Sequence, residues 1–454
     1  MSEDWEELAG EKGERVPTSR LGRMFKLGSL SARVTASTMA GKVAGVFKRD
    51  PDAAADHFER LYAKNAHRVV DVLGELKGAS LKVGQLLSAD PELLPDEFSQ
   101  GLTALQKDVP PMTYNTVKAQ LEEAFDRPME MVFDYFDDEP IGSASIGQVH
   151  RARLQSGEDV AVKVQYPGVV DSLESDLKTL KNFLVYGKVA IDGQRMDEYF
   201  EEVRRIVLEE ADYESEAENM ARLRSVLAER EGVTAPKPYV EWTRPTVLVM
   251  EYMEGTKFDD ALEEMEDHDR RDEILERWVV NYAWMFHEAH LLHADPHPGN
   301  FLLDEDGQIV VLDFGCVKEV SPDFADGILD VLVAYWAGDM ERVLEAYRRA
   351  GYGIDGTEEI DLDLLAEYQD IILACFARNE PFDFGSWQPA MEGKKFMLRH
   401  PSFWKLPPPS EGLAFFRVLS GIKGLLYKLD AKINVYRGAR EIAERRGRLG
   451  DTMA

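Results

Sequence analysis

Apolar residues recur at steps of three and four in the first periodic part of the chain: Val72, Leu76, Ala79, Val83 and Leu86. This spacing predicts a helix that buries one face, within a helical pattern that begins near Ala53. Residues 113–135 predict a further helix followed by a connector.

Short runs rich in β-branched residues begin near Ile141 and predict a change to strands. Four such runs stand out: 148–154, 160–165, 246–251 and 308–313. The first two form a hairpin in this prediction, because Gly157 lies between them. Helical periodicity returns over 170–230 and 270–292. It dominates from residue 322 to the C-terminus, with a proline break at 407–409.

Composition excludes several classes of protein. The chain has 454 residues, of which 44% are hydrophobic, so it holds enough apolar material for a globular core. Its 53 Lys and Arg stand against 84 Asp and Glu, and the net charge is −31. This balance argues against a nucleic-acid-binding protein, because phosphate contacts require clustered Lys and Arg. With two cysteines, Cys316 and Cys375, the chain has neither a disulfide-rich scaffold nor a four-cysteine zinc site.

Residues 15–49 are a basic exception in this acidic chain, with eight Lys and Arg and no Asp or Glu. The segment has two interpretations: a solvated, partly disordered tail, or an arm that contacts an anionic membrane or partner. The chain has no run of about 18 apolar residues and no secretory signal pattern at its start. We therefore expect a cytoplasmic protein without a transmembrane helix, whose contact with a membrane would be peripheral.

The strongest chemical signal is the segment 293–300, HADPHPGN, which is followed by Asp-Phe-Gly at 313–315. Asp295 and Asn300 are five positions apart. The Asp and Asn of a protein-kinase catalytic loop have the same spacing, and an Asp-Phe-Gly follows them as well. Mg²⁺ prefers oxygen ligands, which Asn300 and Asp313 can supply. Asp295 then has the position that orients an attacking hydroxyl group or water.

A second signal is Lys163, which ends the run VAVK. A lysine on a strand that otherwise faces the core is costly unless it is paired. In kinases this lysine binds the α- and β-phosphates. Upstream, the segment 140–150 (PIGSASIGQVH) predicts two strands joined by small residues. Such a turn either lets backbone N–H groups approach phosphates or is an ordinary tight hairpin.

An acidic run at 208–216 has two interpretations, a solvated helix face or the source of a partner for Lys163. Glu216 is the candidate partner, and its position 53 residues after Lys163 predicts helices inserted between the two.

Two other patterns indicate no function on periodicity alone. Lys82 and Gln85 are three positions apart and share a helix face, which by itself indicates a helix with a polar side. His287, His290 and His293 are spaced by three, but neither His-Glu-x-x-His nor a cysteine partner accompanies them. We expect His287 and His290 to pack or cap within their helix rather than to bind zinc.

Seven motifs follow one another along the chain: GASLKVGQLLS at 78–88, LPDEFSQGLTALQKDVPPM at 94–112, PIGSASIGQVHRA at 140–152, VAVKVQYPGV at 160–169, EADYESEAEN at 210–219, HADPHPGN at 293–300 and LDFG at 312–315. With them the chain resembles the UbiB/AarF-type atypical kinase-like family, in its coenzyme Q biosynthesis branch, from about residue 60 to residue 435. The KxGQ element at Lys82 and Gln85 is diagnostic of that family.

The resemblance implies an α+β, protein-kinase-like fold of two lobes, with an N-terminal helical extension packed over the active site. We accordingly expect four regions along the chain. They are a basic, disordered arm at 1–52, the helical extension with the KxGQ motif at 53–135, an N-lobe with inserted helices at 136–255 and a mainly helical C-lobe at 256–454.

The resemblance also implies a role for each matching residue. Asp295 is catalytic, together with Lys163 and its partner Glu216, while Asn300 and Asp313 bind Mg²⁺. The implied nucleotide-binding residues are Gly142, Ser143, Ala144, Ser145, Val162, Lys163, Met250, Glu251 and Met253. The residues implied to regulate access and nucleotide selectivity are Lys82, Gln85, Glu210 and Asp212.

The activity implied by the resemblance is Mg²⁺-dependent ATP binding, with ATPase or small-molecule kinase activity and little protein phosphorylation. It implies a supporting role in ubiquinone biosynthesis at a membrane, through isoprenoid quinone precursors or biosynthetic proteins. Two features depart from the family. Gly142 and Ser143 stand where its loop often has alanines, which would shift nucleotide preference, and the chain lacks the transmembrane helix of several relatives.

Two alternative functions remain. A phosphotransferase of the aminoglycoside or choline type has a similar catalytic loop, but it lacks the KVGQ and SASIGQVH motifs. A nucleotide-gated lipid chaperone or scaffold without turnover would keep the same nucleotide-binding residues.

Overall fold

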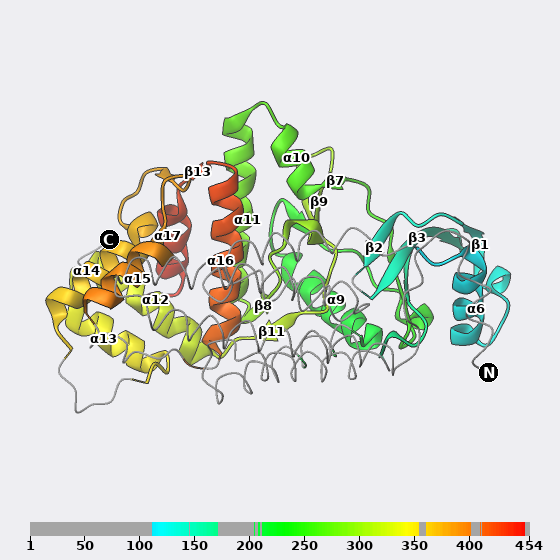
Figure 1. The fold of residues 1–454 in the computed structure, drawn as a ribbon, viewed down its shortest axis with the longest axis horizontal. Helices are drawn as coiled ribbons and strands as arrows, with labels where there is room; N and C mark the ends of the chain where they lie inside the picture. The colour runs from blue at the N-terminus through cyan, green and yellow to red at the C-terminus, as the bar shows by residue number, and fades with distance from the viewer. Residues whose placement is uncertain are drawn as a thin grey trace, which may run out of the picture. The chain divides into compact units, whose positions relative to one another are not determined.

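The structure is a computed structural model that describes residues 111–144, 146–170, 204, 208, 211–353, 360–400, 409 and 411–449. The chain forms two compact units (Figure 1). Unit 1 comprises Met1–Ala217 and Pro238–Tyr252, and unit 2 comprises Glu218–Lys237 and Met253–Ala454. Several predictions fall outside the described residues: the arm at 1–52, the KxGQ segment with Lys82 and Gln85, Ser145 and Glu210.

Unit 1 is built on an antiparallel sheet in the order β1-β3-β4-β6, with β2 paired to the other end of β3. Its strands are β1 (Phe133–Phe136), β2 (Gly142–Ala144), β3 (Gly147–Leu154), β4 (Asp159–Gln165) and β6 (Val247–Glu251). Helix α6 (Tyr114–Phe125) packs against this sheet with its apolar stripe of Val117, Leu121 and Phe125 (Figure 1). The stripe shares one core cluster with Val160, Val162 and Val164 of β4. Because side chains alternate along a strand, Lys163 lies on the opposite face of β4.

The predicted hairpin is confirmed, and strand structure begins earlier than predicted. β3 and β4 pair in antiparallel register, and Gly157 in the turn between them has a φ of 103°. The connector expected before residue 135 instead contains β1, which pairs with β3, so the boundary expected between residues 135 and 136 divides a strand. With four residues and an exposed Asp134, β1 has no β-branched run, and its pairing with β3 makes it a strand.

Unit 2 contains a four-stranded sheet in the order β5-β10-β9-β7 and two shorter pairs, β8 with β11 and β12 with β13. Its strands are β5 (Val233–Thr234), β7 (Thr256–Lys257), β8 (Leu291–His293), β9 (Phe301–Leu303), β10 (Ile309–Val311), β11 (Val317–Glu319), β12 (Phe382–Asp383) and β13 (Lys432–Ile433). Its helices are α10 (Phe258–Glu264), α11 (His268–His287), α12 (Pro322–Trp336), α13 (Met340–Arg349), α14 (Leu362–Ile372), α15 (Pro389–Arg399), α16 (Gly412–Lys428) and α17 (Val435–Arg445). Helix α9 (Tyr213–Leu227) starts in unit 1 and ends in unit 2. The predicted mainly helical pattern after residue 322 is thus confirmed for the described residues.

Helix α11 ends at His287, earlier than the predicted residue 292, because the chain turns sharply into β8. His290 has a φ of 51° in this turn and lies outside the helix, so the expectation that it packs within the helix was wrong. His287 does pack as expected: it is buried, and its Nδ1–H donates to the carbonyl of Ala325 at 3.0 Å. None of the described helices combines the length and hydropathy of a membrane span.

Candidate active site

In unit 1 the predicted pairing of Lys163 with Glu216 is present. The Nζ of Lys163 donates to both carboxylate oxygens of Glu216, at 2.8 and 2.9 Å. The two side chains are only 6% and 0% exposed, so the ion pair is almost completely removed from water. The ring of Tyr213 lies 4.9 Å from the same Nζ and adds a cation–π contact.

The start of helix α9 determines where Glu216 lies. The carboxylate of Asp212 accepts from the N–H groups of Glu214 and Ser215, both at 3.2 Å, and therefore caps the helix one turn before Glu216. Gln165, buried at the end of β4, donates to the carbonyl of Ala211 at 2.7 Å. Gln165 thus attaches the residues before α9 to the sheet that carries Lys163. Sequence reasoning missed this residue, whose signal was a polar side chain ending a buried strand.

The predicted nucleotide-loop residues Gly142, Ser143 and Ala144 form β2, which pairs with β3. Gly142 and Ser143 are exposed, and Ala144 pairs with Gly147 beside the turn. A Cβ atom at Gly147 would collide with the backbone carbonyl of Val164, so this position requires glycine. Gly142 has open space around it. Ser143 and Gly142 therefore present backbone and small side chains to solvent, which suits close approach to a phosphate.

The other predicted nucleotide-binding residues divide between two faces of the sheet. Met250 pairs with Ala161, and both share the face of Lys163. Val162 faces the core cluster with α6, so the structure does not bring it together with Lys163. Glu251 ends β6, and Met253 is the first residue of the second segment of unit 2.

In unit 2 the catalytic-loop motif connects β8 to β9. The side-chain amide of Asn300 donates to the carbonyl of Asp295 at 3.3 Å, which leaves the amide oxygen as the atom able to bind a cation. Leu312 donates its N–H to the carbonyl of Asn300 at 2.9 Å, and this bond joins the loop to the residue before Asp313. The carboxylate of Asp313 accepts from the N–H of Gly315 at 3.0 Å, as an Asx turn. The backbone therefore holds Asn300 and Asp313 as neighbours.

Sequence reasoning missed His293, which connects the two motifs. Its Nε2–H donates to the carbonyl of Asp313 at 2.7 Å, and its Nδ1 forms a hydrogen bond with the hydroxyl of Tyr282 at 3.0 Å. A carbonyl only accepts, so this contact places a proton on Nε2. Burial, with a contribution from the charge of Asp295, raises the pKa of Tyr282 well above its usual value and keeps it a donor. The available signal for His293 was its position two residues before Asp295 in the motif HADPHPGN.

Asn219 is a second residue that sequence reasoning missed. Its side chain donates to the carbonyl of Phe314 at 3.2 Å and so fixes the middle of the Asp-Phe-Gly segment. It follows Glu216 by three positions within the motif EADYESEAEN, which was the available signal.

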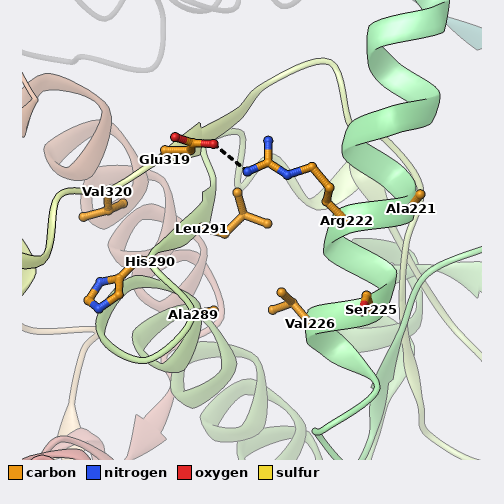
Figure 2. A pocket seen from close by; sticks show the side chains of 9 residues that line it. All are labelled: Ala221, Arg222, Ser225, Val226, Ala289, His290, Leu291, Glu319 and Val320. Carbon is orange, nitrogen blue, oxygen red and sulfur yellow. Dashed lines mark hydrogen bonds and ion pairs between the residues drawn. The ribbon is translucent and has the colours of Figure 1, made fainter.

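An open hollow of about 640 Å³ lies in unit 2 beside α9 (Figure 2). Figure 2 shows Arg222 of α9 directed at Glu319 of β11, with which it forms an exposed ion pair at 2.6 Å. None of the predicted site residues is among the described residues that line the hollow. We therefore place the candidate chemistry at the two motif sets and not here.

Comparison with known proteins agrees with the geometry. Residues 104–347, more than half of the chain, match the ABC1 atypical kinase-like domain. "Atypical kinase coq-8, mitochondrial" of Caenorhabditis elegans is 30% identical over 436 residues, which cover 92% of this chain and 56% of that protein. "Atypical kinase COQ8B, mitochondrial" of Danio rerio is 28% identical over 430 residues, covering 93% and 68%. The chain thus spans little more than half the length of the worm protein.

A solved structure shows a similar fold. It is the complex of Rv3197 with erythromycin from Mycobacterium tuberculosis, with a TM-score of 0.62 and 26% sequence identity. The similarity covers 87% of this chain and 98% of that one. The mixture of sheet and helices in both units is therefore a kinase-like fold.

Proposed function

Because the chain belongs to the ABC1 atypical kinase-like family, the UbiB-type kinases, we propose that it is a Mg²⁺-dependent ATPase or small-molecule kinase. In this proposal it supports isoprenoid quinone biosynthesis and phosphorylates proteins little or not at all. The observation that carries the proposal is the buried ion pair of Lys163 and Glu216. Such a pair contributes little to stability relative to apolar residues, so its presence favours a functional role.

Each polar side chain of the candidate site has a role in the proposed reaction. Lys163, oriented by Glu216, binds the α- and β-phosphates of ATP. Asp295 accepts a hydrogen bond from the attacking water or hydroxyl group and orients it. The carboxylate of Asp313 and the amide oxygen of Asn300 are hard oxygen donors that fit Mg²⁺. Bound Mg²⁺ would neutralise charge on the phosphates.

The wider role rests on the resemblance and on charge. We propose isoprenoid quinone precursors or quinone-biosynthesis proteins as partners, because the relatives named above are COQ8-type atypical kinases. The basic segment 15–49 is the proposed contact with an anionic membrane. A scaffold or lipid chaperone that binds nucleotide without turnover, and a phosphotransferase of the aminoglycoside or choline type, are the competing functions.

Two isosteric variants test the proposal. Asp313→Asn removes the charged metal ligand, so Mg²⁺-dependent ATP affinity should fall by at least about tenfold, or about 1.4 kcal/mol. Asp295→Asn should keep that affinity and lower turnover by roughly 10²–10⁴. The measurements are nucleotide-induced thermal stabilisation and Mg²⁺-dependent ATP hydrolysis, each with and without anionic liposomes.

The outcomes separate the candidates. ATP hydrolysis by Asp295→Asn at the parent rate would show that the catalytic assignment is wrong. Thermal stabilisation by ATP without any hydrolysis by the parent would favour the scaffold. Turnover that appears only with an aminoglycoside or choline as acceptor would favour the phosphotransferase.

A further inference from the structure

Helix α16 carries Arg417, which contacts both candidate motifs of unit 2, the loop that contains Asp295 and the Asp-Phe-Gly segment. The Nε–H of Arg417 donates to the carbonyl of Ala294 at 2.9 Å, and Nη2 donates to the same oxygen. Nη2 also lies 3.0 Å from the sulfur of Cys316. Ala294 directly precedes Asp295, and Cys316 directly follows the Asp-Phe-Gly segment.

The two residues that Arg417 contacts are already paired through their backbones. Ala294 donates its N–H to the carbonyl of Cys316 at 2.8 Å, which extends the ladder formed by β8 and β11. Beyond this pair the two segments separate: the one after Ala294 leads to Asp295, and the one before Cys316 leads back to Asp313. The carbonyl of Ala294 is therefore a backbone acceptor at the point of divergence, and the guanidinium is its donor. Arginine suits this place because its planar fork donates to two acceptors at once.

A second contact holds the same helix against the same loop. Gly421 lies one turn after Arg417, and a Cβ atom there would come 2.5 Å from Cγ of Pro296. Pro296 is the residue after Asp295 and is buried. Arg417 and Gly421 share one face of α16, since residues four apart lie above one another. The helix thus contacts the residues on both sides of Asp295, by a charged hydrogen bond before it and by close packing after it.

We propose that Arg417 is a positioning residue, which holds Asp295 in the geometry required for turnover without itself contacting the nucleotide. The inference rests on the proposed ATP-dependent function. A hydrogen bond from a charged donor is about twice as strong as a neutral one. Its loss would let the carbonyl of Ala294, and with it Asp295, shift, while the carbonyl of Asn300 still accepts from Leu312 and the carboxylate of Asp313 still accepts from Gly315. Turnover should then fall more than nucleotide affinity.

The test compares Arg417→Ala and Arg417→Lys with the parent in the full-length chain. Arg417→Ala should lower kcat for Mg²⁺-dependent ATP hydrolysis by about 10- to 100-fold, since displacements near 1 Å have effects of this size. The KM for ATP and the nucleotide-induced thermal shift should stay within about twofold. Arg417→Lys should recover part of kcat, because an ammonium group can still donate to the carbonyl of Ala294.

Lys428→Ala is the matched control, because Lys428 is a cation on the same helix that pairs with Glu263. It should leave kcat unchanged. A second control is Arg417→Ala in the Asp295→Asn background, where little further loss is expected if Arg417 acts through Asp295.

Three results would overturn the inference: a parent-like kcat in Arg417→Ala, equal losses in kcat and in nucleotide affinity, or no recovery by Arg417→Lys. If Arg417→Ala fails to fold, the inference is tested by comparing the kcat of Arg417→Lys with the kcat of Lys428→Ala. A parent that binds ATP and never hydrolyses it refutes the proposed function instead, and this result is visible before any Arg417 variant is made.

Discussion

At the residue scale, the proposed function of the buried ion pair of Lys163 and Glu216 opposes stability. Two charges with 6% and 0% exposure have lost most of their hydration, and their mutual attraction offsets this cost only while both are present. The carboxylate that orients Lys163 therefore also prevents it from being an unpaired buried charge.

This reasoning predicts an asymmetric effect of substitution. Glu216→Leu should lower the free energy of unfolding by about 3–5 kcal/mol, because it leaves a buried ammonium without its partner. The double variant Lys163→Met/Glu216→Leu should recover most of that loss, whereas both variants should lose ATP affinity. Urea unfolding and nucleotide titration measure the two effects. A double variant as unstable as the single one would contradict this account.

His287 predicts a pH dependence of stability. Burial lowers its pKa to about 4 from 6.5, so the folded chain holds the ring neutral. Protonation then favours the unfolded chain, and stability is lost as pH falls from about 6.5 toward 4. Between pH 7 and pH 5 this one group should lower the free energy of unfolding by about 2 kcal/mol. His287→Gln should show a correspondingly smaller difference between urea unfolding at the two pH values, and an equal difference would refute the assignment.

At the element scale, the hairpin of β2 and β3 depends on one of its glycines. A Cβ atom at Gly147 meets the backbone carbonyl of Val164, whereas Gly142 has nothing within 4 Å. Gly147→Ala should therefore destabilise the chain by about 1–3 kcal/mol through overpacking. Gly142→Ala is the control in the same hairpin and should stay within about 0.5 kcal/mol. Urea unfolding measures the stability of both variants, and equal destabilisation by the two substitutions would contradict this prediction.

The elements also show which local patterns are informative. The strands β3 and β4 were predicted, at 148–154 and 160–165, because β-branched residues and a turn glycine agree. β1 and β8 were missed, because a run of three or four residues has too little periodicity to indicate a strand. Both become strands through partners distant in sequence, β3 for one and β11 for the other.

At the scale of the whole molecule, charge sets the conditions for membrane contact. A chain of net charge −31 is repelled by anionic lipid, so binding would depend on the basic segment 15–49. Replacing Arg15, Arg20, Arg23 and Lys26 by Gln should weaken binding to anionic vesicles by at least about tenfold, since each basic residue contributes about 1 kcal/mol near the surface.

Vesicle sedimentation measures this binding, and a second variant controls for net charge. It carries Gln at four exposed lysines of unit 2: Lys394, Lys395, Lys428 and Lys432. This variant should bind like the parent, and both should be released by high salt. Equal weakening in the two variants would assign the effect to overall charge and remove segment 15–49 from the proposal.

The sequence by itself determined which residues carry the proposed chemistry. The spacing of Asp295, Asn300 and Asp313 predicted a kinase-like site, because the required residue types stand at fixed separations, and Glu216 was the candidate partner of Lys163. Tertiary structure decided which groups support them: Gln165, His293 and Arg417 act through hydrogen bonds to backbone carbonyls. Every residue has such a carbonyl, so these bonds leave no pattern of residue types along the chain. They exist only once folding brings distant segments together.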